Sequence, residues 1–241
     1  MVNYRDMSIG ELLALTPPGW GGALLNGLSL SLQVAGGGYL LGLLIGVAGA
    51  AGKLSGGPVT RDLLTCYTTI IRAVPELVLI LMIYFGFPLA LNQLLTTLGF
   101  GRVEVSAFAA GIVVIGLVQG AYATEVIRGA IRAIPRGQLE AAYAMGMSSF
   151  LTFRRITIPA MLPGAIPGLS NLWLIATKDT ALLAVVGFTE LTLASRQAAG
   201  ATKHYLLFLG IAGLLYLFVS FISNRLFRTL ERRVTPGERH A

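Results

Sequence analysis

Charged side chains at the edges of long apolar stretches are the residues of this chain that have the means to do chemistry. Arg72 and Glu76 lie four residues apart at the start of one apolar stretch, and Lys178, Asp179 and Thr180 lie together at the end of another. A charge in apolar surroundings needs an opposite charge, water or a bound polar solute. The pattern therefore predicts recognition of a charged solute, or mutual neutralisation of the charges, and not bond breaking.

Sequence motifs for bond-breaking chemistry are missing from the chain. It contains no G-x-x-x-x-G-K-[ST] phosphate loop, no H-E-x-x-H and no G-x-S-x-G. The two histidines, His204 and His240, accompany no acid-base arrangement, and the single Cys66 excludes an internal disulfide. We therefore expect no enzyme activity, no metal and no cofactor in this chain, and ATP, where it is used, on a separate polypeptide.

The composition is that of a membrane protein. Of the 241 residues 55% are hydrophobic and 12% charged, whereas about a quarter of the residues of a soluble domain are charged. Roughly 20 apolar residues suffice to cross a bilayer. Five uncharged runs are long enough to hold a crossing: 12–52, 77–101, 105–124, 156–177 and 205–224. The sequence therefore predicts an all-α integral membrane protein with five transmembrane helices.

The longest run, 12–52, is expected to hold one crossing, with a sixth crossing as the alternative. Residues 16–19 are Thr-Pro-Pro-Gly and residues 36–38 are three glycines, and stretches of this kind tend to interrupt helices. No removable signal peptide is evident at the start of the sequence. We interpret 1–22 as an N-terminal interfacial segment, 23–228 as a transmembrane domain and 229–241 as a tail.

Positive charges favour one orientation, because Lys and Arg near helix ends are retained in the cytoplasm. With five crossings, twelve of the 18 Lys and Arg residues fall on one side and four on the other. The larger set comprises Lys53, Arg61, Arg128, Arg132, Arg136, Arg154, Arg155, Arg225, Arg228, Arg232, Arg233 and Arg239. The N terminus is therefore expected outside and the C terminus inside, and the net charge of +7 calls for no nucleic-acid partner.

The largest cytoplasmic loop, 136–159, has the pattern of two short helices. Residues 136–145 favour a helix, Gly146 permits a turn, Ser148 or Ser149 can cap a second helix, and Pro159 is expected to end it. Small alanines would let another protein approach the backbone closely. From periodicity alone, this helix pair is either a docking site for a protein or an amphipathic loop that rests on lipid headgroups.

The spacing in this loop resembles the EAA motif of type I ABC importer permeases. The matching residues are Glu140, Ala141, Ala142, Gly146, Ile156 and Pro159, with Ile158 in place of the usual Leu. The resemblance implies that these residues couple the chain to a cytoplasmic ATPase. In that family the helix pair inserts into a groove on the ATPase and passes its closure to the membrane helices.

A narrower resemblance covers nearly the whole chain. The segments AGKLSG, CYTTIIRAVPELVLILMIYFG, GAYATEVIRGAIRAIPRGQLEAA, KDTALLAVVG and SNRLFRTLERR occur in the order seen in polar amino acid permeases. They are most similar to the Q-type subunits of histidine/lysine/arginine/ornithine systems and to opine permeases. The resemblance implies a bacterial inner-membrane subunit that works with a second permease subunit, an ATPase dimer that binds ATP, and a periplasmic solute-binding protein. The implied substrate is a polar, basic amino acid or an opine.

Two interpretations of the membrane charges stay open. If the second crossing begins near Leu64, a rise of about 1.5 Å per residue places Glu76 about 18 Å deep. Glu76 then either pairs with Arg72 along one helix or faces the translocation path and attracts a cationic solute. Thr180 is a candidate on the same path, although we favour a structural role for its tripeptide. Glu125 and Arg128 are interpreted as a local ion pair or as interface groups.

The alternative function is a self-sufficient secondary transporter or channel. Such proteins are often built from paired repeats with interrupted helices at corresponding positions. The sequence shows no convincing internal repeat. Five crossings with a docking loop therefore favour half of a pore that a partner completes.

Overall fold

The computed structural model describes residues 7–234, and the regular elements in this range are all helical. In chain order they are α1 (Ile9–Leu12), α2 (Gly21–Ser55), α3 (Pro58–Ala73), α4 (Glu76–Thr97), α5 (Ala107–Arg132), α6 (Arg136–Ala144), α7 (Ser149–Thr152), a π-helical turn η2 (Phe153–Thr157), α8 (Ile158–Asp179), a 3-10 segment η3 (Thr180–Val186), α9 (Leu191–Thr202) and α10 (Tyr205–Val234). The predicted all-α class is confirmed for this part of the chain. Arg5, Arg239 and His240 lie outside it.

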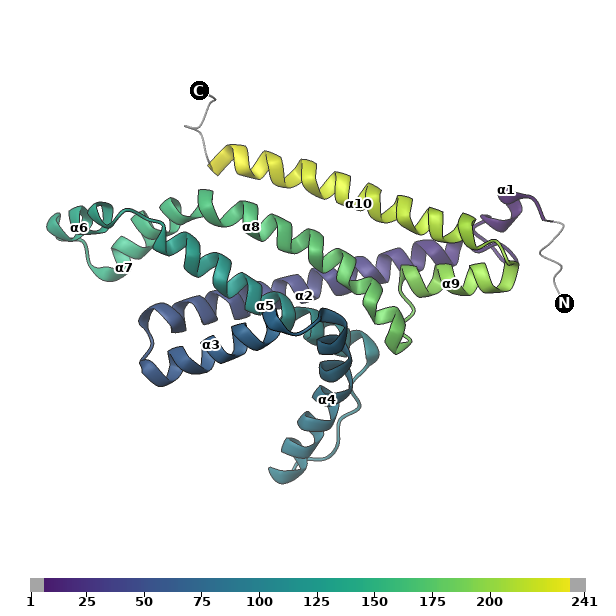
Figure 1. The fold of residues 1–241 in the computed structure, drawn as a ribbon, viewed down its shortest axis with the longest axis horizontal. Helices are drawn as coiled ribbons and strands as arrows, with labels where there is room; N and C mark the ends of the chain where they lie inside the picture. Colours follow the sequence, from purple (N-terminus) through teal and green to yellow (C-terminus); the bar gives the residue numbers. More distant parts are fainter. Residues whose placement is uncertain (1–6, 235–241) are drawn as a thin grey trace.

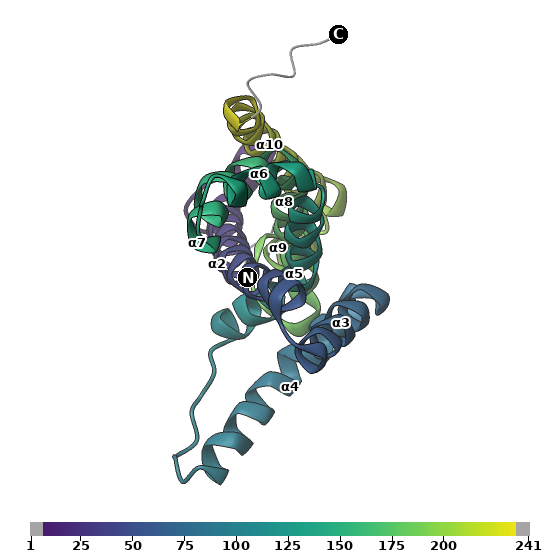
Figure 2. The same cartoon turned by 90° about the vertical axis from the view of Figure 1, so that its left-hand side faces the viewer.

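Five helical stretches in the described range are long and apolar enough to cross a membrane: α2, α4, α5, the continuous stretch Ser149–Val186, and α10. The number of long apolar helices therefore equals the predicted number of crossings. Helices α2, α5, α8 and α10 run along the long axis of the molecule, with α6 and α7 at one end and α1 and α9 at the other (Figure 1). Helix α4 leans away from the others, as the turned view in Figure 2 also shows.

Helix α2 is unbroken over 35 residues, so the expected interruption by the glycines at 36–38 is wrong. The reason is close packing against α5. A Cβ atom added at Gly38 would lie 2.6 Å from Ile115, one at Gly42 would lie 2.9 Å from the Cβ of Gln119, and one at Gly46 would lie 2.5 Å from the Cβ of Ala123. In a membrane, small residues let helix backbones approach and gain van der Waals contact. These glycines therefore hold α2 against α5.

We expect Gly46→Leu to destabilise the permease fold by about 1–3 kcal/mol, because the added side chain overpacks the contact between α2 and α5. Gly36→Leu is the matched control, since Gly36 lies on the same helix and a Cβ there meets nothing within 4 Å. The measurement is the thermal unfolding temperature of each purified variant. Equal unfolding temperatures for the two variants would show that the glycine contact does not hold the helices together.

The chain bends between α3 and α4, at Val74 and Pro75. Val74 has an extended backbone, with φ −90° and ψ 139°, as expected for a residue that precedes proline. Arg72 therefore belongs to the last turn of α3, and Glu76 begins α4. The interpretation in which Arg72 and Glu76 pair along one helix is therefore wrong, and among the described residues no ion pair joins them.

Candidate functional site

The bend between α3 and α4 brings two acidic side chains together near the middle of the molecule. Glu76 is half-buried in the first turn of α4, and Asp179 is buried at the C-terminal end of α8. The carboxyl groups of Glu76 and Asp179 lie close to each other. Two carboxylates at this distance repel each other when both are ionised, so the pair needs a proton or a cation between them. The pair forms the centre of the candidate site.

Gln119 fixes the position of Asp179. It lies on α5 with 1% of its surface exposed, and its Nε2 donates a hydrogen bond of 3.0 Å to Oδ2 of Asp179. Its own Oε1 is buried and has no hydrogen-bond partner among the described residues. Sequence reasoning missed Gln119, and the available signal was a lone amide within an apolar stretch.

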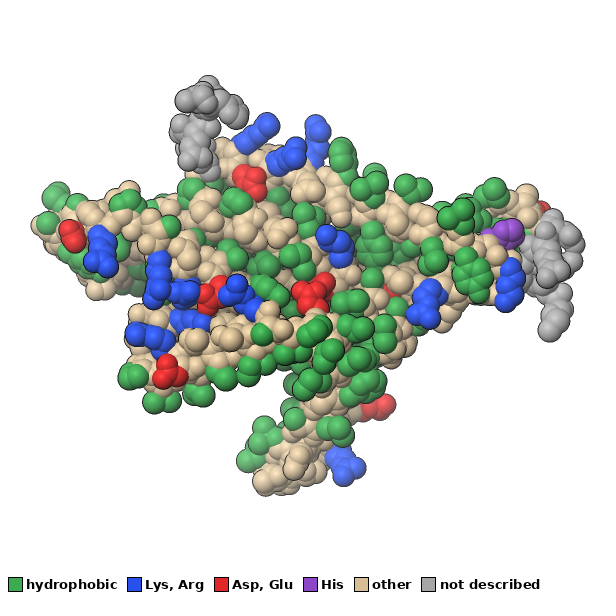
Figure 3. Space-filling model, viewed as in Figure 1, with side chains coloured by type: hydrophobic (Ala, Val, Ile, Leu, Met, Phe, Trp, Pro, Cys, Tyr) green, Lys and Arg blue, Asp and Glu red, His purple; other side chains and the backbone are tan. Residues whose placement is uncertain are grey.

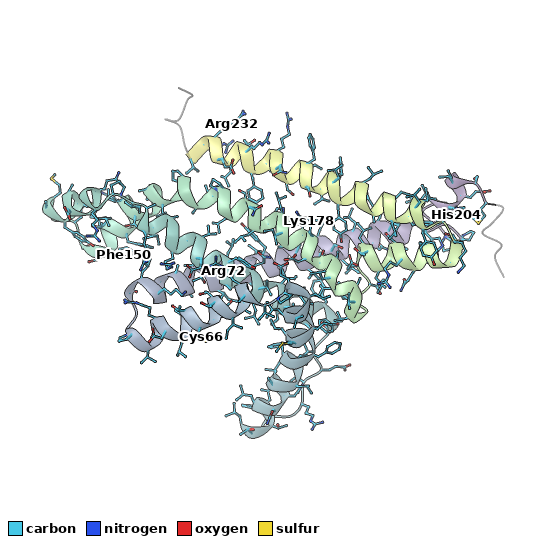
Figure 4. All side chains as sticks on the ribbon, viewed as in Figure 1. Cys66, Arg72, Phe150, Lys178, His204 and Arg232 are labelled. Carbon is cyan, nitrogen blue, oxygen red and sulfur yellow. The ribbon has the colours of Figure 1, made fainter. Side chains whose placement is uncertain are left out.

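Cations and an aromatic ring flank the acidic pair. The guanidinium carbon of Arg72 lies 5.9 Å from the ring centroid of Tyr122 on α5, which is within the range of a cation–π contact. The Tyr122 hydroxyl lies near Glu76 and Asp179 as well as Arg72. Figure 4 labels Arg72 and Lys178, which come from α3 and α8 toward the centre of the molecule. The site therefore joins groups from four helices.

Thr180, the third candidate on the substrate path, lies in another polar environment. It is fully buried, and its hydroxyl donates a 2.8 Å hydrogen bond to the carbonyl of Thr177. It also lies near the Tyr216 hydroxyl. That hydroxyl donates a 2.9 Å hydrogen bond to the carboxylate of the fully buried Glu190. Glu190 in turn caps α9 by accepting the backbone N–H groups of residues 192 and 193. The hydroxyl of Thr180 thus donates its hydrogen bond to the end of the preceding helix α8.

A second charged cluster lies at the end of the molecule that carries α6 and α7. The carboxylate of Glu125 on α5 forms ion pairs with Lys53 Nζ at 2.7 Å and with Arg128 Nη2 at 2.5 Å. Lys53 also donates to the Thr68 hydroxyl at 2.6 Å. The predicted pairing of Glu125 with Arg128 is confirmed, and Lys53 extends it to α2 and α3.

The two helices predicted in the loop 136–159 are present as α6 and α7, but the second helix does not end at Pro159. Gly146 turns the chain with φ +76°, and the Ser148 side chain caps α7 by accepting the backbone N–H of Leu151. Pro159, however, ends no helix. It lies in the first turn of α8, where a missing N–H costs little, so the helix runs on from α7 through the π-helical turn.

The tip of this helix pair is exposed and largely apolar. Glu140, Ala141 and Gly146 lie on the surface, whereas Ala142 is buried against the rest of the loop. Four large apolar side chains are exposed here: Tyr143, Met145, Phe150 and Phe153. Ile156 is half-buried and Pro159 is exposed. An exposed apolar patch with a fixed charge is typical of a protein docking surface.

A family comparison decides which kind of protein has this architecture. Residues 38–236 match the family model described as binding-protein-dependent transport system inner membrane component. The chain belongs to this family. It is a multi-pass inner-membrane permease subunit of a transport system that uses a binding protein, and it is not an enzyme.

Curated relatives cover nearly the whole permease. It is 40% identical over 223 residues to the histidine/lysine/arginine/ornithine transport system permease protein HisQ of Salmonella typhimurium, which covers 92% of this chain and 98% of HisQ. It is 36% identical over 232 residues to the octopine transport system permease protein OccQ of Rhizobium radiobacter, and this match covers 96% of this chain and 98% of OccQ. The resemblance to polar amino acid permeases is confirmed.

Solved structures share the fold of the permease. One is an amino acid ABC transporter crystallised with histidines, with a TM-score of 0.75 and 28% identity over 89% of this chain and 95% of that chain. Another is the MetNI methionine ABC transporter in an inward-facing conformation. Its TM-score is 0.68 at 18% identity, over 95% of this chain and 100% of that chain. At that identity the likeness concerns the fold alone.

Proposed function

We propose that this permease subunit moves a basic amino acid or an opine across the inner membrane by alternating access, past the acidic pair formed by Glu76 and Asp179. The observation that carries the proposal is that these two carboxyl groups lie close together, with Asp179 held by Gln119 of α5. A charge at membrane depth is costly unless it faces a partner or water. The names of the relatives, which transport lysine, arginine, ornithine, histidine or octopine, support the same substrate class.

The acidic pair favours a cationic group of the solute. A side-chain ammonium or guanidinium between Glu76 and Asp179 would remove their mutual repulsion, and a guanidinium can donate to two carboxylates at once. Gln119 keeps Asp179 oriented toward this position. Arg72, held near Tyr122, is placed to attract the carboxylate of the same solute.

Energy for transport comes, in this proposal, from an ATPase dimer that binds ATP and docks on α6 and α7. The residues assigned to that contact are Glu140, Ala141, Ala142, Gly146, Ile156 and Pro159. A second permease subunit completes the pore, and helix α4, whose apolar side chains Met82, Phe85 and Leu89 are exposed, gives it a surface. The solute-binding protein delivers its load at the opposite end, beside α1 and α9.

The direct test is reconstitution of the permease with its ATPase, partner subunit and binding protein in liposomes. Uptake is measured with radiolabelled lysine, arginine, ornithine, histidine, octopine and a neutral amino acid. We expect ATP-dependent uptake of one or more cationic solutes or opines. Uptake of only neutral amino acids would overturn the substrate class, and uptake without the ATPase would overturn the energy source.

Topology gives an independent prediction, motivated by the bias of Lys and Arg toward the end of the molecule that carries α6 and α7. Cys66 is exposed, so the measurement uses a Cys66→Ser background. A cysteine at the exposed Gln197 on α9 is expected to react with an impermeant reagent added outside, and one at Gly146 is not. Labelling of position 146 from outside would reverse the orientation and rule out the ATPase contact.

A further inference from the structure

A cationic cavity lies between α2, α3 and α5, apart from the acidic pair. Its volume is about 250 Å³, and it is lined by Lys53, Arg61, Thr65, Thr68, Thr69, Arg72, Glu125, Arg128 and Arg132. Five cations thus face one carboxylate. Figure 3 shows a group of Lys and Arg side chains (blue), with fewer acidic ones (red), in the region of α3 and α5. Of the residues that line this cavity, the substrate proposal uses only Arg72 and the coupling proposal uses none.

The charges in the cavity are only partly neutralised by the protein. Glu125 already pairs with Lys53 and Arg128. Arg61 and Arg132 form no ion pair within residues 7–234, and Asp62, the acidic neighbour of Arg61 along α3, does not line the cavity. Arg72 likewise forms no ion pair in the described range, and its guanidinium carbon lies 5.9 Å from the centroid of the Tyr122 ring. The cavity therefore carries an excess of positive charge that an anion would balance.

Size and position narrow the chemistry of that anion. The volume is slightly below the roughly 300 Å³ at which pockets for drug-sized ligands begin, so a compact group fits better than an extended one. Lys53, Arg61 and Arg132 each lie within a turn of a helix end, at the end of the molecule that carries α6 and α7 (Figure 1). Basic pockets between transmembrane helices, close to the cytoplasmic ends of the helices, bind the anionic headgroups of lipids. A guanidinium group can donate two parallel hydrogen bonds to the oxygens of one phosphate.

We propose that this cavity binds a phosphate group, carried by an anionic phospholipid or by a soluble phosphate. Lys53 is fixed in position within the site. Its side chain is 6% exposed, and its Nζ donates hydrogen bonds to Thr68 and Glu125. Arg61 and Arg132 line the cavity from two different helices, α3 and α5. A second cationic cleft, beside Arg225 and Arg228, is larger at about 420 Å³ and takes all its lining residues from α10, so a single helix lines it.

The test measures the unfolding temperature of the permease in its purified complex in detergent. The first arm adds dioctanoyl-phosphatidylglycerol, with dioctanoyl-phosphatidylcholine as its zwitterionic control. The second arm adds inorganic phosphate, with potassium chloride at equal ionic strength as its control. At ligand about 100-fold above Kd, binding is expected to raise the unfolding temperature by about 5 °C or more. A rise with phosphatidylglycerol alone identifies a lipid, and an equal rise with phosphate identifies a soluble anion.

Matched variants place the effect in the cavity. The pair Arg61→Gln and Arg132→Gln is expected to abolish the rise, whereas Arg225→Gln with Arg228→Gln, the same change of charge on α10, is expected to keep it. All four residues are exposed, so the variants change little packing. Native mass spectrometry of the same samples counts retained lipid. The proposal is overturned if the wild type shows no rise in either arm, if the cavity variant keeps it, or if only the α10 variant loses it.

Discussion

Replacing Gly146 with proline is expected to abolish transport-linked ATP hydrolysis while the permease still assembles in the membrane. Gly146 has φ +76°, whereas proline is fixed near −65°. Its N–H also donates a 2.9 Å hydrogen bond to the carbonyl of Tyr143, which proline cannot form. Loss of the turn costs about 3 kcal/mol or more, equivalent to more than about 100-fold in an equilibrium, so α6 and α7 can no longer present one docking surface.

Gly99→Pro is the matched control for this prediction. Gly99 also has a left-handed backbone, with φ +82°, and its N–H donates a 3.1 Å hydrogen bond to the carbonyl of Thr96. Unlike Gly146, it lies in the loop between α4 and α5. The measurement is ATP hydrolysis by the reconstituted complex, with and without loaded binding protein. Substrate-stimulated hydrolysis is expected to survive in Gly99→Pro and to disappear in Gly146→Pro. Normal stimulation in both variants would remove the coupling role from α6 and α7.

Neutralising the acidic pair is expected to change substrate selectivity. Glu76→Gln and Asp179→Asn keep the shape of each side chain and remove its charge. A hydrogen bond to a charged group contributes about 1.5–3 kcal/mol, so uptake of lysine or arginine at low concentration is expected to fall roughly 10- to 100-fold. Uptake of a neutral amino acid by the same complex is expected to fall much less. The measurement is a pair of uptake rates, normalised to the amount of assembled complex.

A structural role of Glu76 gives a different result in the same experiment. If Glu76 only balanced Arg72, its loss would leave a cation without its opposite charge and would lower the uptake of every substrate alike. Glu104→Gln is the control for charge, since Glu104 is exposed in the loop between α4 and α5. An equal loss for basic and neutral substrates, or no loss, would remove the acidic pair from substrate recognition.

Sequence patterns predicted what depends on local composition. The number of crossings follows from the length of apolar runs, and the turn at Gly146 with its cap at Ser148 follows from the backbone preferences of glycine and serine. The bend at Val74 was equally local, because the residue before proline avoids the helical region. The interpretation that pairs Arg72 and Glu76 along one helix gave too little weight to that rule.

Features that depend on packing between distant segments could not be predicted. The glycines at 36–38 resemble a helix break along the sequence, whereas in the structure Gly37 and Gly38 pack against α5 within a continuous helix. Gln119 and Asp179 are 60 residues apart, and nothing in either segment indicates their hydrogen bond. The commitment of Thr180 to the carbonyl of Thr177 likewise depends on how η3 follows α8.

If the proposed function holds, the continuous stretch Ser149–Val186 would act as a mechanical lever between the ATPase contact and the solute. Pro163 and Pro167 lie inside α8, and each removes a backbone hydrogen bond, so the stretch has its natural pivot there. From Pro167 to Asp179 the arm is about 18 Å long at about 1.5 Å per residue. A tilt of about 10° at the pivot would therefore carry the Asp179 carboxylate about 3 Å, roughly the length of one hydrogen bond. Motion of that size is enough to take Asp179 out of reach of Glu76, and so to release whatever cation the two had held.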